Sequence, residues 1–295
     1  MGHVGDAMKK FGAEPPRNEG PRKPGSTADA TTPPVGAAPK AGPVAEPTVG
    51  TMAGLLDLQE DRDARPNNNL IPCSGFSESL VAHSDRGSMV TEQYRVIRTN
   101  LMAKFPERRF CLMVTSAEPN EGKTATTLNM GLILAETQEG RTVIVDGDLR
   151  KGRVASYLGV KRGPGVVDVI RGTAKLKDVI RTTEYPGLDI LTSGQVASNE
   201  IGDILTRPEL PEMLAELRQR YNFVLIDTPP VNEISDAAII GRHVCGALLV
   251  VSMFKTRRES VRKTIRMLHA VSIDVLGMVL TKQKYFIPRY LYRYS

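Results

Sequence analysis

The sequence predicts an α/β domain with a mostly parallel sheet and helices on both of its faces, preceded by a long arm that lacks a core. Two observations carry this prediction. Short apolar runs rich in β-branched residues recur from about Ser84 onward, and helix-length amphipathic segments separate them. Strands that are apolar along their whole length, alternating with helices, are typical of a parallel sheet buried on both faces.

The first 70 residues differ from the rest in composition. They are rich in Pro, Gly, Ala and Thr and lack the apolar periodicity that a core requires, so we expect a disordered linker. Within it, the segment MAGLLDL at 52–58 is interpreted as stray apolar residues, with a docking peptide as the alternative. We therefore divide the chain into a linker over 1–70, an α/β domain over 71–281 and a tail over 282–295.

The composition limits the classes of function. A chain of 295 residues that is 41% hydrophobic and 24% charged suffices for one sizeable domain with extensions. It has no apolar run of membrane-spanning length and no secretory segment near Met1, so we expect a cytoplasmic protein. The three cysteines lack metal-ligand spacing, and the 5% aromatic content without Trp argues against an RNA-stacking platform. The net charge of +6 suits phosphate ligands, nucleic acid or an anionic membrane.

The expected elements follow one another in alternation. Helices are predicted over 124–138, 209–221 and 257–271. The predicted strands are CLMVT at 111–115, TVIVD at 142–146, LDILT at 188–192, FVLID at 223–227, GALLVV at 246–251 and LGMVL at 276–280.

The stretch SAEPNEGKTATT, residues 116–127, joins the first predicted strand to its helix. Its spacing, Ala117-x4-Gly122-Lys123-Thr124, fits a P-loop with Ala in place of the first Gly. In such a loop the backbone N–H groups and a helix N-terminus hold phosphates, the lysine reaches the β- and γ-phosphates, and the hydroxyl ligates Mg²⁺. The residues expected to bind a nucleotide are Ala117, Asn120, Glu121, Gly122, Lys123, Thr124 and Ala125.

Three aspartates follow apolar runs. VIVDGDLR places Asp146 and Asp148 at the end of one predicted strand, and FVLIDTPP places Asp227 at the end of another. Ligands of open α/β sheets bind beyond the carboxyl ends of the strands, so the three carboxylates should meet the P-loop at one edge. A strand-end turn explains a single Asp, whereas three beside a GKT sequence indicate a nucleotide and Mg²⁺ site. Arg150 and Lys151 are interpreted either as positive charge for this site or as a solvated loop.

Together these motifs resemble those of the bacterial tyrosine autokinases, the BY-kinases of capsular and exopolysaccharide biosynthesis. AEPNEGKTATT resembles their Walker A motif, VIVDGDLRKGR their Walker A′ motif and FVLIDTPPV their Walker B motif. SDRGSMVTEQYRVIRTNL resembles the segment that precedes their P-loop, and the resemblance covers about residues 84–295. The related ATPases of cell division and plasmid partition carry a signature lysine where this chain has Glu118.

The resemblance implies an ATP- and Mg²⁺-dependent kinase that phosphorylates its own tyrosines. Lys123 would polarise the phosphates, and Thr124, Asp146 and Asp227 would hold Mg²⁺. Asp146 would also act as the base for the tyrosine hydroxyl, with Asp148 supporting the metal site. A tyrosine hydroxyl has an ordinary pKa near 10, so its proton needs a positioned acceptor at neutral pH. The implied role is control of polysaccharide polymerisation or export, with a membrane-embedded activator that recruits the kinase to the inner face of the membrane.

The chain ends in KQKYFIPRYLYRYS. The family phosphorylates a C-terminal tyrosine cluster, so the expected acceptors are Tyr285, Tyr290, Tyr292 and Tyr294. A strip that binds a membrane or another subunit, or a frayed end, is the alternative. The tail from residue 282 has four basic and no acidic side chains, and each phosphate adds roughly −1.5 to −2 charges. Phosphorylation would therefore reverse its charge and release it from the acidic site of a neighbouring subunit.

Glu92, Arg95 and Arg98 are spaced three apart, so they share one helix face. They match the oligomerisation pattern of the family, which implies a ring; an exposed, salt-bridged helix face is the alternative. Two positions depart from the family: Thr281 stands where Asn is frequent, and Cys245 where Asp is common. The alternative function is a non-kinase ATPase switch that controls association with a partner or a membrane. Nucleic acid is not expected as a partner.

Overall fold

The computed structural model describes residues 70–137, 140–233 and 235–282. The predicted linker, its segment 52–58 and the tail with its four tyrosines lie outside these residues, apart from Leu70 and Lys282. Across the described ranges, no helix combines the length and the apolar character that crossing a bilayer requires.

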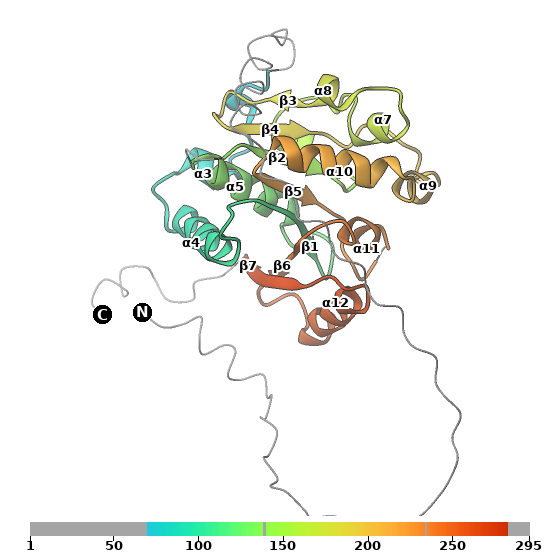
Figure 1. The fold of residues 1–295 in the computed structure, drawn as a ribbon. Coiled ribbons are helices and arrows are strands. Elements are labelled where there is room, and N and C mark those ends of the chain that lie inside the picture. Colours follow the sequence, from blue (N-terminus) through green and yellow to red (C-terminus); the bar gives the residue numbers. More distant parts are fainter. Residues whose placement is uncertain (1–69, 138–139, 234, 283–295) are drawn as a thin grey trace, which may run out of the picture. The chain divides into compact units, whose positions relative to one another are not determined.

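A seven-stranded sheet of order β3-β4-β2-β5-β1-β6-β7 forms the centre of the domain (Figure 1). Neighbouring strands are parallel except β3 and β4, which confirms the predicted mostly parallel sheet. The strands are β1 (Phe110–Ser116), β2 (Thr142–Asp146), β3 (Arg181–Thr182), β4 (Leu188–Leu191), β5 (Phe223–Asp227), β6 (Gly246–Ser252) and β7 (Val275–Thr281).

Short and long helices connect the strands. The helices predicted over 124–138, 209–221 and 257–271 correspond to α5, α10 and α12. The remaining short helices and the antiparallel strand β3 were not predicted, because segments of two to six residues carry too little periodicity. The helices are η2 (Cys73–Gly75), α3 (Val81–Ser84), α4 (Met89–Lys104), α5 (Lys123–Ala135), α6 (Val154–Tyr157), α7 (Val166–Ile170), α8 (Leu176–Val179), α9 (Ile201–Leu205), α10 (Glu209–Arg220), α11 (Asp236–Gly241) and α12 (Arg258–Ala270).

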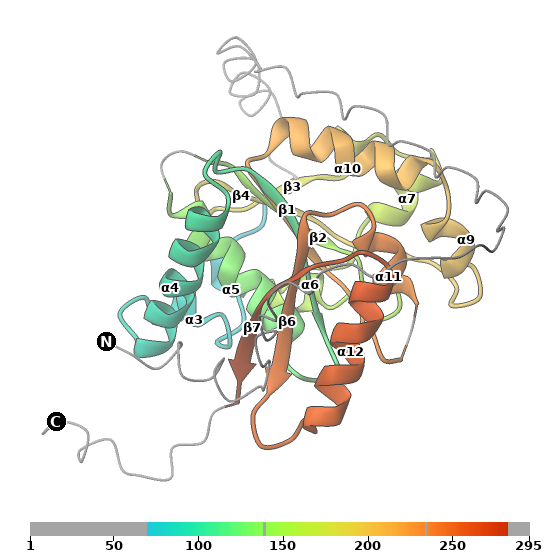
Figure 2. The same cartoon turned by 60° about the horizontal axis from the view of Figure 1, so that its bottom comes forward.

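Two hydrophobic cores lie on opposite faces of the sheet. Cys111 and Met113 of β1 belong to the core that α7–α12 cover, whereas Leu112 and Val114 belong to the core that α3–α6 cover. Successive side chains of a strand point to opposite faces, so every residue of β1 is buried. Figure 2 shows the two helical layers, with α4 and α5 on one side of the sheet and α11 and α12 on the other. This arrangement explains the continuous apolar runs in the sequence.

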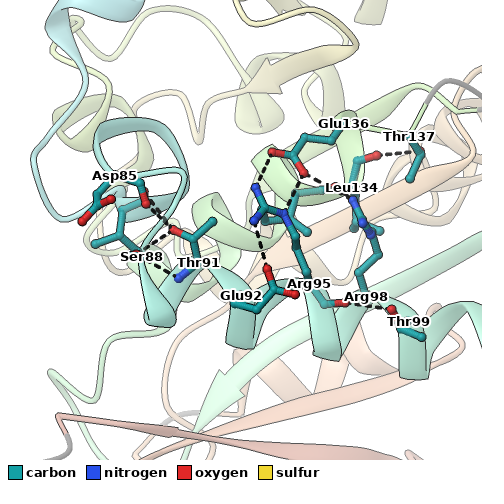
Figure 3. A network of polar contacts seen from close by, with 12 residues as sticks. Asp85, Ser88, Thr91, Glu92, Arg95, Arg98, Thr99, Leu134, Glu136 and Thr137 are labelled. Carbon is teal, nitrogen blue, oxygen red and sulfur yellow. Dashed lines mark hydrogen bonds and ion pairs between the residues drawn. The ribbon is translucent and has the colours of Figure 1, made fainter. Parts of the chain in front are cut away.

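Helix α4 is fixed at its start by its own side chains. The Ser88 hydroxyl accepts a hydrogen bond from the Thr91 amide at 3.1 Å, and the Thr91 hydroxyl donates to the Asp85 carbonyl at 2.7 Å (Figure 3). Thr91 is fully buried. A side-chain N-cap of this kind stabilises a helix by about 1 kcal/mol. It thereby sets the direction of the helix that carries Glu92, Arg95 and Arg98.

Candidate nucleotide site and active site

The P-loop crosses the carboxyl edge of the sheet between β1 and α5. Asn120 and Gly122 adopt left-handed backbone conformations, with φ of 60° and 100°. The positive φ favours glycine at position 122, although a Cβ atom there would make only an ordinary contact, at 3.5 Å, with the Thr281 side chain. The loop borders a pocket at this edge, whose lining residues are Asn120, Gly122, Lys123, Thr124, Asp148, Lys151, Arg153, Tyr157 and Lys282.

Glu121, predicted to bind nucleotide, braces the loop with its side chain. Its buried carboxylate accepts hydrogen bonds from the Glu118 amide at 2.7 Å, the Ser252 amide at 3.1 Å and the Thr256 hydroxyl. These contacts join the loop to the end of β6 and to the segment that precedes α12. The other predicted residues outside the pocket lining are Ala117, which directly follows β1, and Ala125, which lies in α5.

Lys123 begins α5 and lines the pocket, although its side chain is almost fully buried. Burial lowers the pKa of its ammonium group, and the nearby carboxylates of Asp227 and Asp148 oppose that decrease. The lysine is therefore a poorly hydrated donor held between carboxylates and the pocket. Such a group interacts strongly with a phosphate that displaces the remaining water.

Asp227 lies at the end of β5 behind the P-loop. The Thr124 hydroxyl donates to its Oδ2 atom at 2.6 Å, and the Thr127 hydroxyl lies 3.5 Å from Oδ1. Burial raises the pKa of this carboxyl to about 7, because the bond from Thr124 and the charge of Lys123 offset the loss of hydration only in part. The hydroxyl and the carboxylate predicted to hold Mg²⁺ are thus in direct contact.

Asp146 lies beside Asp227, paired with it in register across β2 and β5. It is fully buried, and its pKa is raised well above the ordinary value by burial and by the charge of Asp227. Its Oδ2 atom accepts a bond from the Val154 amide at 3.2 Å, while Oδ1 has no hydrogen-bond partner among the described residues. A buried carboxylate oxygen without a donor, next to a second carboxylate, is an arrangement that a bound cation stabilises.

The oxygen atoms of this site fit the way in which nucleotide-dependent enzymes bind Mg²⁺. Within the described ranges, no group of three or more His, Cys, Asp or Glu side chains has the arrangement of a metal cage. Mg²⁺ is commonly bound by one or two carboxylates together with substrate phosphates and water. Asp146, Asp227 and the Thr124 hydroxyl offer such donors; Thr124 lines the pocket, and the two carboxylates are buried behind it.

The loop after β2 separates the two basic residues that follow Asp148. Lys151 lines the pocket, and its amide donates to Asp148 Oδ1 at 3.1 Å. Arg150 does not line it, because its guanidinium binds the Asp236 carboxylate through Nε at 2.8 Å and Nη2 at 3.2 Å. The interpretation of Arg150 as positive charge for the site is therefore wrong, since Asp236 neutralises it and joins two loops of the active edge.

Sequence reasoning missed three residues of the pocket lining: Arg153, Tyr157 and Lys282. Two of them hold Asn120 from either side. Arg153 Nη1 donates to the Asn120 side-chain oxygen at 3.3 Å, and Lys282 Nζ donates to the Asn120 carbonyl at 2.5 Å. The adjacent Thr281 hydroxyl donates to the Glu121 carbonyl at 2.6 Å. The residues where β7 ends thus contact the backbone of the P-loop.

Two of the three predicted interface residues, Arg95 and Arg98, contact another helix of the same chain (Figure 3). Arg95 binds Glu92 at 3.1 Å and Glu136, at the end of α5, at 3.4 Å. Arg98 donates to the Ile133 carbonyl at 2.8 Å and lies 3.4 Å from Glu136. Contact with Glu136 is the main cause of the raised pKa of Arg95. The three residues share a face as expected, and Glu136, which the sequence analysis missed, joins the two arginines.

Comparison with known proteins agrees with this geometry. A family model described as an AAA domain matches residues 119–252. The tyrosine-protein kinase YwqD of Bacillus subtilis is 30% identical over 212 residues, which cover 72% of this chain and 89% of that protein. The putative tyrosine-protein kinase EpsB of Ralstonia solanacearum is 32% identical over 189 residues, but this chain spans only 25% of its length.

The fold is also that of a solved kinase. The kinase domain of the Escherichia coli tyrosine kinase ETK superposes with a TM-score of 0.65 at 26% identity, covering 76% of this chain and 87% of that one. Fold, P-loop, paired aspartates and relatives all point to one family, and the chain belongs to the bacterial tyrosine-protein kinases.

Proposed function

We propose that this chain transfers the γ-phosphoryl group of ATP to the tyrosine cluster at the C-terminus of another copy of itself. The observation that carries the proposal is the pair of buried carboxylates, Asp146 and Asp227, beside Lys123 and Thr124 of the P-loop. This is a site for a phosphate chain with a divalent cation. The acceptors would be Tyr285, Tyr290, Tyr292 and Tyr294.

Each residue has a distinct role in this proposal. Lys123 holds the β- and γ-phosphates and neutralises the charge that develops on them during transfer. Thr124, Asp146 and Asp227 hold Mg²⁺, which when bound adds positive charge next to the phosphates. Asp148 lines the pocket, where its carboxylate supports the metal site by accepting hydrogen bonds from the surrounding water.

Asp146 is the proposed base. A carboxyl whose pKa is raised binds a proton more tightly than an exposed one, which suits acceptance of the tyrosine proton. Its unpartnered Oδ1 atom is the oxygen available for either the cation or the proton. The backbone N–H groups of the loop from Asn120 to Ala125 position the phosphates for in-line attack.

The wider role rests on the family. We propose that the kinase acts in capsular or exopolysaccharide polymerisation and export, in the cytoplasm, with a membrane-embedded activator. Assembly into a ring would use the α4 face that carries Glu92, Arg95 and Arg98. The division into a linker over 1–70, a kinase domain over 71–281 and an acceptor tail over 282–295 is part of the same proposal.

A mixing experiment with two variants tests transfer between copies. The acceptor variant carries Lys123→Ala and an intact tail, and the donor variant carries Phe at all four tail tyrosines and an intact P-loop. Neither should label itself with ATP and Mg²⁺, whereas the mixture should place phosphate on the tail of the acceptor variant. No labelling in the mixture, with labelling of the unmodified protein, would mean transfer within one copy. Release of free phosphate by the unmodified protein, with no phosphotyrosine, would instead establish the ATPase switch.

A further inference from the structure

A concentration of positive charge lies on α12 and the turn before it. Residues 254–267 contain six basic side chains and one acidic side chain, Glu259, a net charge of +5. All six basic side chains are exposed, and within the described residues none of them forms an ion pair. They are Lys255, Arg257, Arg258, Arg262, Lys263 and Arg266.

Some arginines elsewhere pair with carboxylates, such as Arg141 with Asp189 and Arg171 with Glu200, whereas the six basic side chains of this segment do not. On α12, Arg258, Arg262 and Arg266 are spaced four apart and form a stripe along one face of the helix. Three neighbouring guanidinium groups without carboxylates repel one another. The arrangement costs stability unless a negatively charged partner contacts the stripe.

Exposed apolar side chains lie next to this helix. Met278 and Leu280 of the edge strand β7 are 53% and 58% exposed, and they alternate with Val279, which is buried in the core under α4 and α5. They therefore point to the opposite face of the sheet, the face on which α12 packs. Phe254, in the turn before α12, is 71% exposed. Figure 2 shows α12 beside β6 and β7 at this edge.

We propose that α12 and the adjacent edge of the sheet form a surface that binds an anionic phospholipid bilayer. Peripheral membrane surfaces combine basic side chains that contact lipid phosphates with apolar side chains that enter the headgroup layer. Both are present here on the same side of the sheet. A nucleic-acid surface would need the arginines but not exposed Met278 and Leu280, and an apolar protein interface would not need five net charges.

The proposed function already includes a membrane-embedded activator, and this surface would attach the protein to the membrane at a second point. Lipid binding by this surface does not depend on kinase activity. The stripe lies outside the nucleotide pocket, so phosphate binding by the P-loop leaves these arginines available. Each basic residue near an anionic surface contributes about 1 kcal/mol of attraction, which falls within a Debye length of about 10 Å. Attachment should therefore weaken as salt is added.

The test is cosedimentation of the purified full-length protein, without nucleotide, with phosphatidylcholine vesicles and with vesicles that also contain phosphatidylglycerol. The stripe variant carries Arg258→Gln, Arg262→Gln and Arg266→Gln. The control variant carries Lys161→Gln, Lys175→Gln and Lys177→Gln, which removes the same charge from exposed positions near the opposite edge of the sheet. We expect binding only to anionic vesicles, reduced roughly a hundredfold in the stripe variant and little in the control.

Three outcomes would overturn the assignment: no binding by the unmodified protein, equal binding to neutral vesicles, or equal losses in the two variants. Binding of a short DNA duplex in place of vesicles would assign the surface to nucleic acid. Nucleotide affinity checks that the stripe variant is folded. Should it unfold, Leu280→Ser provides a second test, since loss of an inserted leucine should weaken vesicle binding at least about threefold. Unchanged binding of that variant would contradict membrane contact at this edge.

Discussion

Two of the places where this domain buries aspartates differ in how the negative charge is compensated. Asp189 of β4 is buried, and its Oδ2 atom accepts bonds from Arg141 at 2.8 Å and from the Tyr221 hydroxyl at 2.8 Å. Asp146 and Asp227 are just as buried, but within the described residues no arginine binds them, and hydroxyl or amide groups provide their hydrogen bonds. The first site is neutralised within the chain, whereas the second keeps negative charge that Lys123 offsets only in part.

This difference distinguishes a buried charge that belongs to the fold from a buried charge that serves a ligand. A buried carboxylate without a counterion destabilises the folded state, so its persistence indicates that a ligand provides the positive charge. Here the P-loop adjoins the carboxylates, and the counterion is expected to arrive with the nucleotide. Asp189 lies away from the pocket and has its counterion already in place.

The largest effect should come from Asp146→Asn. It removes the proposed base and one metal ligand while leaving the volume of the side chain nearly unchanged. We expect the rate of tyrosine phosphorylation to fall by about a thousandfold or more, since general base catalysis alone contributes about 10²–10⁴-fold. The initial rate of phosphotyrosine formation at saturating ATP measures this. Asp189→Asn is the matched control, and comparable losses in both variants, each still folded, would remove the distinction between the two sites.

The stability of the unliganded protein should change in opposite directions at the two sites. Asp189→Asn leaves Arg141 without its carboxylate and should lower the free energy of unfolding by about 3 kcal/mol. Asp227→Asn removes a buried charge that is compensated only in part and should raise the free energy of unfolding by on the order of 2 kcal/mol at pH 8. Urea denaturation of the two variants and the unmodified protein measures both. Destabilisation by Asp227→Asn would show that the carboxylate is compensated within the chain.

The pH dependence of stability follows from the same carboxyl. Because the pKa of Asp227 is about 7 in the folded state and about 3.8 when unfolded, the folded state binds more protons between these values. The free energy of unfolding should therefore decrease, relative to Asp227→Asn, as pH rises from about 4 to about 7, and then level off. Stabilisation by Mg²⁺ and ATP should increase over the same interval, because the cation displaces the proton. A pH-independent difference between the two proteins would contradict the raised pKa.

The smallest effect is expected at the α4–α5 contact. Arg98→Ala removes the bond to the Ile133 carbonyl near the end of α5 and should lower the free energy of unfolding by about 1 kcal/mol. Glu92 is 64% exposed, so Glu92→Ala should change it by less than about 0.5 kcal/mol. Sedimentation velocity then separates the interface from the intrachain role. Loss of the oligomer in Glu92→Ala, with unchanged stability, would support the ring, and an unchanged oligomer would argue against it.

Much of this site was predictable because its parts follow a strand. Apolar runs that end in Asp indicated Asp146 and Asp227, and the spacing before Gly122 indicated the P-loop. Their meeting at one edge follows from parallel strands alone. What the sequence did not predict depends on contacts between distant residues. Lys282 reaches Asn120 across 162 positions, and Asp236 pairs with Arg150 across 86. No local pattern marks either pair, because each depends on the order of strands in the sheet.

Glu121 shows a second limit of the sequence. Its position in the motif predicts contact with a nucleotide, yet its side chain points away from the pocket to Ser252 and Thr256. Only the neighbouring β6 explains this, since the end of that strand and the segment after it provide the donors. Thr281, which stands where the family frequently has Asn, is likewise explained by a contact with a distant residue. Its hydroxyl holds the Glu121 carbonyl, so it fixes the loop from the end of β7.

Mass spectrometry of the full-length protein after incubation with ATP and Mg²⁺, beside Lys123→Ala, tests the central claim most directly. The account predicts phosphate on one or more of Tyr285, Tyr290, Tyr292 and Tyr294 in the unmodified protein and none in the variant. Phosphotyrosine that persists in Lys123→Ala would contradict the assignment of the P-loop as the site of transfer. Bound nucleotide without any phosphotyrosine would contradict the kinase itself.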